Sequence, residues 1–314
     1  MKKILLDGEK KQYKAKLHSH STVSDGILTP LEMKKTYKEH GYSVLAFTDH
    51  GKFVRHNELS DPDFLIINGY EADITENIVD PEWKFRRTCH ICLLAPNENV
   101  ENAPLPCECG EGYNAAHINE LIRRGVKDGF FVTYNHPTWS RERADEYMSY
   151  RGMHCMEIVN YNCIAGGTPE WNEVIYDHML SRGERLYAIA TDDNHNTHWF
   201  PDSFGGFAMI LADELSYKSI FDALMSGSFY ASEGPEIKSV YFEDGTLSVF
   251  TSEAASIRFN TYGRKGKNEN AKDGRLITSA TFKVDPDDKY VRITVTDKNG
   301  KHAYTSAFFT EDLF

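Results

Sequence analysis

The sequence predicts an α/β protein in two parts: a barrel of largely parallel strands over residues 1–235, and a small all-β, sandwich-like domain over residues 236–314. Three observations lead to this prediction. Apolar runs of strand length alternate with helical segments up to about residue 235, as they do in a parallel sheet. Beyond that point the helical signals stop and short strand signals follow. Several of the early apolar runs also end in histidine and carboxylate side chains, and a parallel barrel collects its strand ends on one face.

The elements of the first part follow from local signals. Thr29 and Pro30, with Glu32 just after them, combine an N-cap, a proline at the first helical position and a capping box. Gly41 marks the end of the helix that they begin. Two further helices are expected, one capped by Asn114 and one from Thr168 to Arg182. Strands are predicted over residues 13–17, 43–47, 64–67, 88–95, 130–134, 155–159, 186–190 and 207–211.

The second part has short strand signals separated by turns. Asp244-Gly245 and Asn299-Gly300 are typical of hairpin turns. The polar, glycine-containing stretch over residues 265–275 is expected to be a loop. Strands are predicted over residues 240–242, 247–250, 257–259, 280–284 and 290–295. Several short strands of this kind indicate a small sandwich, expected to be a structural or dimer-forming appendage.

Composition excludes some classes of protein. The net charge of -12 argues against nucleic acid as a partner, because binding a polyanion requires clustered Lys and Arg. No stretch approaches the roughly 20 apolar residues of a membrane helix. The six cysteines show no disulfide framework. A cytoplasmic location without membrane attachment is therefore expected.

Four segments carry metal-binding side chains directly after an apolar run. His18 and His20 share one face of a strand, because side chains alternate with a period of two, and Asp193 and His195 do the same. One such pair is often polar surface, but two pairs together with further strand ends favour a multinuclear metal centre. Nitrogen and oxygen donors without thiolates are typical of hydrolytic sites. The four segments are residues 17–20 (with Asp25 just beyond), 47–50, 134–137 and 191–195.

These segments, in this order, resemble the PHP (polymerase and histidinol phosphatase) family of metal-dependent phosphoesterases. The resemblance covers roughly residues 14–235 and implies a distorted (β/α)7 barrel of the PHP type, followed here by the small β domain. It also implies two to three divalent transition-metal ions, of zinc, manganese or iron. Carried over residue by residue, the implied metal ligands are His18, His20, Asp25, His50, Glu71, His90, His136, Asp193 and His195.

The resemblance further implies how these ligands divide among three ions. The first ion would take His18, His20, Glu71 and Asp193, and the second would take Asp25, His50 and His195. The third would take His90, His136 and the other oxygen of a bridging Glu71. Residues 229–235 and 291–300 also look like the carbaryl-hydrolase-like branch of the family, in which a β domain follows the barrel.

The expected function is hydrolysis of a small phosphomonoester or phosphodiester by a metal-activated hydroxide. Asp49 and Asp192, each beside a ligand, are candidate catalytic residues that orient an imidazole or, alternatively, cap a loop. Arg55 and His56, in the loop after His50, are candidates for contacting the phosphate.

Two other functions remain open from sequence alone. The same metals could serve a carbamate or carboxyl-ester hydrolase, or could stabilise a noncatalytic binding module. The expected partner is a small phosphate ester, without nucleic acid or membrane, and a homo-oligomer is compatible with the sequence.

Overall fold

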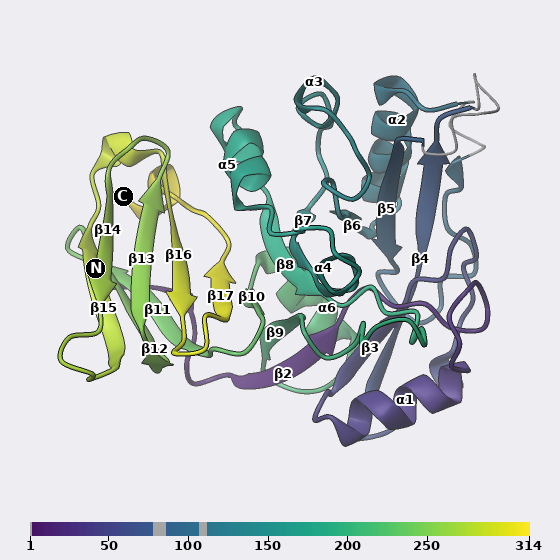
Figure 1. Cartoon of the computed structure of the whole chain (residues 1–314), viewed down its shortest axis with the longest axis horizontal. Coiled ribbons are helices and arrows are strands. Elements are labelled where there is room, and N and C mark those ends of the chain that lie inside the picture. Colours follow the sequence, from purple (N-terminus) through teal and green to yellow (C-terminus); the bar gives the residue numbers. More distant parts are fainter. Residues whose placement is uncertain (1, 78–85, 107–111) are drawn as a thin grey trace.

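The computed structural model describes residues 2–77, 86–106 and 112–314. Its first part is a curved sheet in which most strands run in the same direction, with helices on the outside (Figure 1). β3 pairs in parallel with β2 and β4, and β7 pairs in parallel with β6 and β8, while β5 runs antiparallel between β4 and β6. These strands are β2 (Lys11–Lys16), β3 (Val44–Phe47), β4 (Leu65–Thr75), β5 (Thr88–Leu94), β6 (Phe131–Tyr134), β7 (Cys155–Asn160) and β8 (Tyr187–Thr191).

The segment that follows β2, the first strand of this run, is hydrogen-bonded to the segment that follows β8, the last strand. The backbone N–H of Asp193 donates to the carbonyl of His18 at 3.2 Å, and the N–H of His20 donates to the carbonyl of Asn194 at 3.0 Å. On its other side β2 pairs antiparallel with β9 (Phe207–Ala212), which pairs in turn with β10 (Phe229–Ser232). The segments that follow the first and last strands of the run are therefore neighbours.

A strict (β/α)7 alternation is not confirmed. The pair β4–β5 is antiparallel, and an antiparallel pair needs no crossover helix. The connection from β3 to β4 contains only the short 3₁₀ helix η1 (Asn57–Leu59). The α-helices are α1 (Pro30–Glu39), α2 (Ala115–Lys127), α3 (Ala144–Tyr147), α4 (Tyr161–Ala165), α5 (Glu173–Ser181), α6 (Tyr217–Ser226) and α7 (Thr310–Leu313).

The helix signals were accurate at two of the three predicted starts. Thr29 caps α1 with a complete capping box, and the side chain of Asn114 accepts the hydrogen bond that begins α2. The predicted start at Thr168 is wrong, because α5 begins at Glu173. The segment before it is held differently: Glu170 is buried, and its carboxylate accepts hydrogen bonds from the backbone of Thr138 and Trp139.

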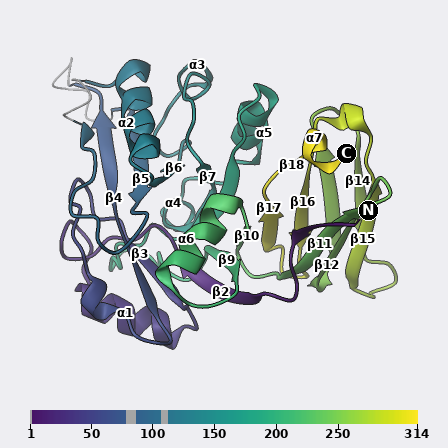
Figure 2. The same cartoon turned by 180° about the vertical axis from the view of Figure 1, so that it is seen from behind.

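The C-terminal part consists of two sheets packed face to face (Figures 1 and 2). One contains β1 (Lys3–Leu6), β11 (Ile237–Glu243), β12 (Thr246–Ala254) and β15 (Ile277–Lys283). The other continues the large sheet from β10 through β17 (His302–Thr305), β16 (Tyr290–Thr296), β13 (Ser256–Thr261) and β14 (Gly266–Asn270), with β18 (Phe308–Phe309) beside β16 and the 3₁₀ helix η3 (Pro286–Asp288) before it. Leu6, Leu247, Phe259 and Ile293 are buried between the sheets.

Two features of this part differ from expectation or add to it. The stretch over residues 265–275, predicted as a loop, contains the edge strand β14. β1 comes from the chain's N-terminus but pairs antiparallel with β11, across the predicted division at residue 235. That division remains a prediction.

The turn at Asp244-Gly245 has φ angles of 48° and 74°, as a hairpin turn of the type expected there requires. Among the described residues, no helix is both long and apolar enough to cross a bilayer.

Candidate metal centre

All nine side chains that the family resemblance implied as ligands lie together at one end of the run of strands. Six of them belong to segments that directly follow β2, β3, β6 and β8, and Asp25 comes from the loop after β2. Glu71 and His90 instead lie within β4 and β5. Parallel strands bring their carboxyl ends to one edge, so strands far apart in sequence deliver side chains to one place.

The deepest group contains His18, His20, Glu71 and Asp193, all of which are buried. His18 Nε2 lies 3.2 Å from Glu71 Oε1 and 3.1 Å from Asp193 Oδ1. His20 Nε2 lies 2.9 Å from the same Asp193 oxygen. Two imidazole nitrogens and two carboxylate oxygens therefore face a common point, and this is the set expected for the first ion.

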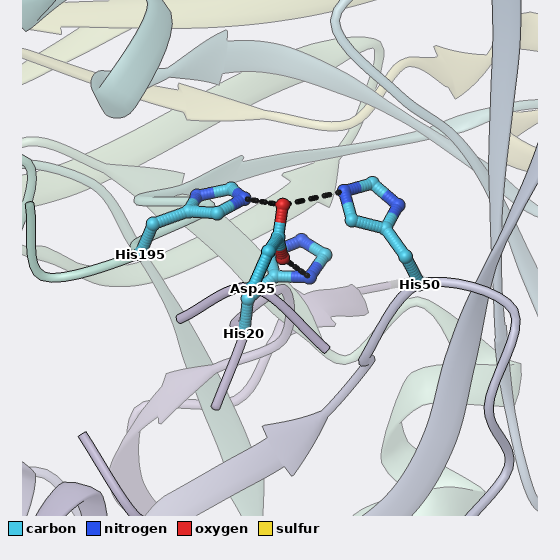
Figure 3. Close-up of side chains that lie close together, drawn as sticks. All are labelled: His20, Asp25, His50 and His195. Atoms are coloured by element: carbon cyan, nitrogen blue, oxygen red, sulfur yellow. Dashed lines mark ion pairs between the residues drawn. The ribbon is translucent and has the colours of Figure 1, made fainter. Parts of the chain in front are cut away.

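A second group lies nearer the solvent and contains His20, Asp25, His50 and His195 (Figure 3). Asp25 Oδ2 is 3.5 Å from His195 Nε2 and 3.8 Å from His50 Nε2, and its other oxygen is 3.8 Å from His20 Nδ1. The side chain of Asp25 is 55% exposed and that of His50 28%, against 1% for Glu71. Solvent therefore reaches the centre from this side. The group contains the set expected for the second ion, with His20 in addition.

The third group joins His50, Glu71 and His90, so Glu71 belongs to two of the three groups. His90 Nδ1 lies 3.2 Å from Glu71 Oε1, and His50 Nδ1 lies 3.1 Å from Glu71 Oε2. His136, expected here, places Nε2 3.2 Å from Glu71 Oε1 but is not within the group. His136 approaches the same Glu71 oxygen as His90, and the two rings lie 4.9 Å apart, with His50 beside the other oxygen of Glu71. The division of these ligands among ions remains a prediction.

The chemistry of these donors fits divalent cations. Within the described part of the chain, Glu71 Oε2, His50 Nδ1, His90 Nδ1 and Asp193 Oδ1 are buried without a hydrogen-bond partner. Buried polar atoms rarely remain unsatisfied, because each costs free energy when it is taken out of water. Here the unsatisfied lone pairs converge on common points. A bound cation would satisfy several of them at once.

The charges of the site support the same reading. Burial would raise the pKa of Glu71, but the imidazoles of His18, His90 and His50 hold it well below its usual range. Burial would lower the pKa of His90, but Glu71 and Asp73 raise it to about 10. Glu71 and His90 thus hold each other in charged forms when no other cation is present. A metal ion would take over the role of those protons as countercharge.

The two candidate aspartates beside the ligands act on backbone. Asp49 Oδ1 accepts hydrogen bonds from the backbone N–H of Ser21 at 2.7 Å and of Ser24 at 3.1 Å, which fixes the loop that carries Asp25. Asp192 accepts from the N–H groups of residues 204–206 and from the Tyr37 hydroxyl. These are loop-capping contacts, the second of the two roles expected. In the residues that the structure describes, neither carboxylate is hydrogen-bonded to an imidazole of the centre.

Asp192 also pairs with Lys16, whose Nζ lies 3.2 Å from Asp192 Oδ2, and both side chains are fully buried. Asp192→Asn should therefore lower the free energy of unfolding by about 3–5 kcal/mol, because it leaves a buried cation without its countercharge. Urea denaturation measures this loss. Adding Lys16→Met should restore part of the stability, since it removes the unpaired charge. If Asp192→Asn alone is as stable as the parent, Asp192 does not serve as the countercharge of Lys16.

The structure separates the two candidates for phosphate contact. Arg55 is exposed in the loop after β3. His56 is buried, and its ring packs edge-on against Phe47 at a centroid distance of 4.7 Å. Phe47 belongs to the hydrophobic cluster beneath α1, so His56 is turned toward that cluster. Arg55 remains a candidate for substrate contact, whereas His56 has the surroundings of a packing residue.

Sequence reasoning missed several residues that touch the centre. Glu157, within β7, is hydrogen-bonded to His18. The Asn135 side chain donates to Glu71 at 2.7 Å, and the Trp139 ring lies 5.0 Å from that of His136. A carboxylate in the middle of an otherwise apolar strand was the available signal for Glu157. Asn135 and Trp139 had no comparable signal.

Comparison with known proteins agrees with this geometry. The PHP domain family matches residues 16–179, which is 164 of the 314 residues. The chain belongs to the PHP domain family. The match includes the segments from His18 to His136, while Asp193 and His195 lie beyond it. No curated protein sequence matches the chain.

Three solved structures resemble this PHP protein at low sequence identity. A two-domain protein from Bacteroides vulgatus, containing a predicted PHP-like metal-dependent phosphoesterase, is 16% identical, with 96% of each chain covered and a TM-score of 0.47. An amidohydrolase from Chromobacterium violaceum is 16% identical over 58% of this chain and 87% of its own, with a TM-score of 0.39. A candidate metal-dependent phosphoesterase from Bifidobacterium adolescentis is 12% identical over 59% and 89%, with a TM-score of 0.38.

Proposed function

We propose that this PHP protein is a metal-dependent phosphoesterase that hydrolyses a small phosphomonoester or phosphodiester. The observation that carries the proposal is the set of three overlapping donor groups, which share His20, His50 and Glu71. Overlapping groups suit a di- or trinuclear centre, because neighbouring ions can then share ligands. Nitrogen and oxygen donors suit zinc, manganese or iron.

Divalent ions bound there would supply a water of lowered pKa and offset the negative charge of a phosphoryl group. The chain's own residues supply the geometry. Glu71 and Asp193 provide the buried negative charge that retains the cations. The more exposed Asp25 and His50 border the side from which a substrate can approach. An anionic substrate can therefore approach this acidic protein, because the bound cations reverse the local field.

Arg55→Ala tests whether the loop after β3 takes part in binding phosphate. A guanidinium offers a planar pair of donors to phosphoryl oxygens that the metals leave free. The change should lower kcat/KM for phosphoesters by an amount worth about 1.5–3 kcal/mol, the usual size for a charged hydrogen bond, and should spare neutral esters. Arg264→Ala, at an exposed arginine of the C-terminal part, is the matched control. Unchanged phosphoester kinetics in Arg55→Ala would show that Arg55 does not contact the phosphate.

Substrate class is tested by comparing turnover of p-nitrophenyl phosphate and bis-p-nitrophenyl phosphate with that of p-nitrophenyl acetate and a p-nitrophenyl carbamate. The protein is loaded in turn with Zn²⁺, Mn²⁺ and Fe²⁺. The proposal expects faster turnover of one of the phosphoesters. A preference for the neutral esters would favour the carbamate or carboxyl-ester alternative, as in the carbaryl-hydrolase-like branch. Tight metal binding without any turnover would favour the noncatalytic binding module.

A further inference from the structure

The side chain of Glu157 is fully buried, and a buried ionised carboxylate is costly unless it is well hydrogen-bonded. Four donors meet this requirement. Oε1 accepts from His18 Nδ1 at 2.7 Å and from the Thr191 hydroxyl at 2.6 Å. Oε2 accepts from the backbone N–H of His136 at 3.0 Å and from Asn160 Nδ2 at 2.9 Å. Every lone-pair direction of the carboxylate is therefore in use.

The bond to His18 fixes which ring nitrogen is free for a metal. Because the carboxylate only accepts, His18 Nδ1 must carry the shared hydrogen. His18 Nε2 then points its lone pair toward Glu71 and Asp193, which lie 3.2 and 3.1 Å away in the deepest donor group. With the other tautomer, an N–H would point into that group and exclude a cation. A carboxylate behind a ligand histidine also raises the basicity of the imidazole.

The remaining bonds of Glu157 tie other ligand-bearing segments to the same carboxylate. His136 is held through its backbone, immediately after β6. Thr191 is the last residue of β8 and lies two residues before Asp193. Asn160, at the end of β7, donates from the same amide nitrogen to Asp193 Oδ2 at 3.2 Å. One side chain thus connects the ends of β2, β6, β7 and β8 without belonging to any donor group.

We infer that Glu157 is a positioning residue that sets the tautomer of His18 and the mutual placement of the ligands that follow β2, β6 and β8. The inference rests on the proposed metal site and adds a residue that would not touch the ions. It predicts that losing the charge and acceptor pattern of Glu157 weakens metal binding, while the fold survives.

Glu170 provides a matched control. Its carboxylate is also buried, and it accepts three hydrogen bonds where that of Glu157 accepts four, from the backbone of Thr138 and Trp139 and from the Asn172 side chain. None of these donors is an imidazole. Glu170→Gln therefore loses a buried acceptor of the same kind, in a loop beside the centre, without releasing a histidine ring.

The experiment titrates metal-free parent, Glu157→Gln and Glu170→Gln with Co²⁺, and follows the visible absorption of the bound ion and competition with a chelator. Glu157→Gln should bind at least one Co²⁺ about 10- to 100-fold more weakly than the parent, with an altered spectrum. The affinity of Glu170→Gln for Co²⁺ should stay within about twofold of that of the parent. Thermal unfolding of the metal-free proteins reports separately on stability.

The outcomes are distinguishable. A parent that binds no Co²⁺ would overturn the proposed function itself. A parent that binds Co²⁺ with Glu157→Gln equally tight, or with both variants equally weakened, would overturn only the role of Glu157. Should Glu157→Gln fail to fold, ring-nitrogen NMR of the Zn²⁺-loaded parent decides. The inference requires a proton on His18 Nδ1 and the metal on Nε2, and the reverse assignment would refute it.

Discussion

Glu71→Gln is expected to lower kcat/KM for a phosphoester on the order of 1,000-fold or more, well beyond the 10- to 100-fold typical of residues behind the ligands. The reason is its central place in the site. Besides His18 and His90, the carboxylate of Glu71 lies within 3.4 Å of nitrogens of His20, His50 and His136. The amide of glutamine has the same shape, but it has no charge and only one oxygen. A bridging role cannot survive the change.

Elemental analysis should accompany the kinetics, and at least one ion should be missing from Glu71→Gln. Glu142→Gln is a suitable control: Glu142 lies in the same loop as His136, but it accepts hydrogen bonds from the hydroxyls of Tyr113, Tyr134 and Tyr150. That control should keep its metal content. Full metal content and activity in Glu71→Gln would show that Glu71 does not bridge ions.

Removal of metal should abolish turnover and also destabilise the fold. Protein purified without chelator is expected to contain two to three divalent transition-metal ions per chain. A ligand present at 1,000 times its Kd stabilises the native state by about 4.1 kcal/mol, so chelation should lower Tm by several degrees. The physical cause is that the buried ligand atoms of Glu71, Asp193 and His90 are left without a cation and without a hydrogen-bond partner, which costs free energy.

Mass spectrometry of metals and calorimetric scans before and after chelation measure both effects. Adding Zn²⁺, Mn²⁺ or Fe²⁺ back should restore the higher Tm, and the effective ion should restore turnover. A chain that folds normally but takes up none of the three would contradict the whole functional proposal.

The strands and the histidine-bearing segments were predictable because local patterns encode them. His18 and His20 directly follow a strand, and so do His50 and His136, so each could be placed at a strand end without knowing the fold. Glu71 lies within a strand, where nothing local distinguishes a ligand from a packing or surface residue. Only the family resemblance brought it and His90 into the set.

What sequence could not supply was contact between distant segments. Thr168-Pro169-Glu170 has the local pattern of a helix start, but Glu170 instead serves the backbone at Thr138 and Trp139, about 30 residues earlier. Similarly, nothing in β1 indicates that its partner is β11, more than 200 residues later. The role of Glu157 depends on four segments meeting, which no pattern within one strand reveals.

The pairing of β1 with β11 has a practical consequence for dissecting the molecule. A fragment ending at residue 235 would leave β1 without β11 and β10 without β17, and so would present two open strand edges at once. Unpaired edges invite association with other chains. A C-terminal fragment beginning at residue 236 would lack the strand that covers β11 on one side. Separate expression of the halves is therefore a poor route to either, and a usable boundary would have to carry residues 3–6 with the C-terminal sheets.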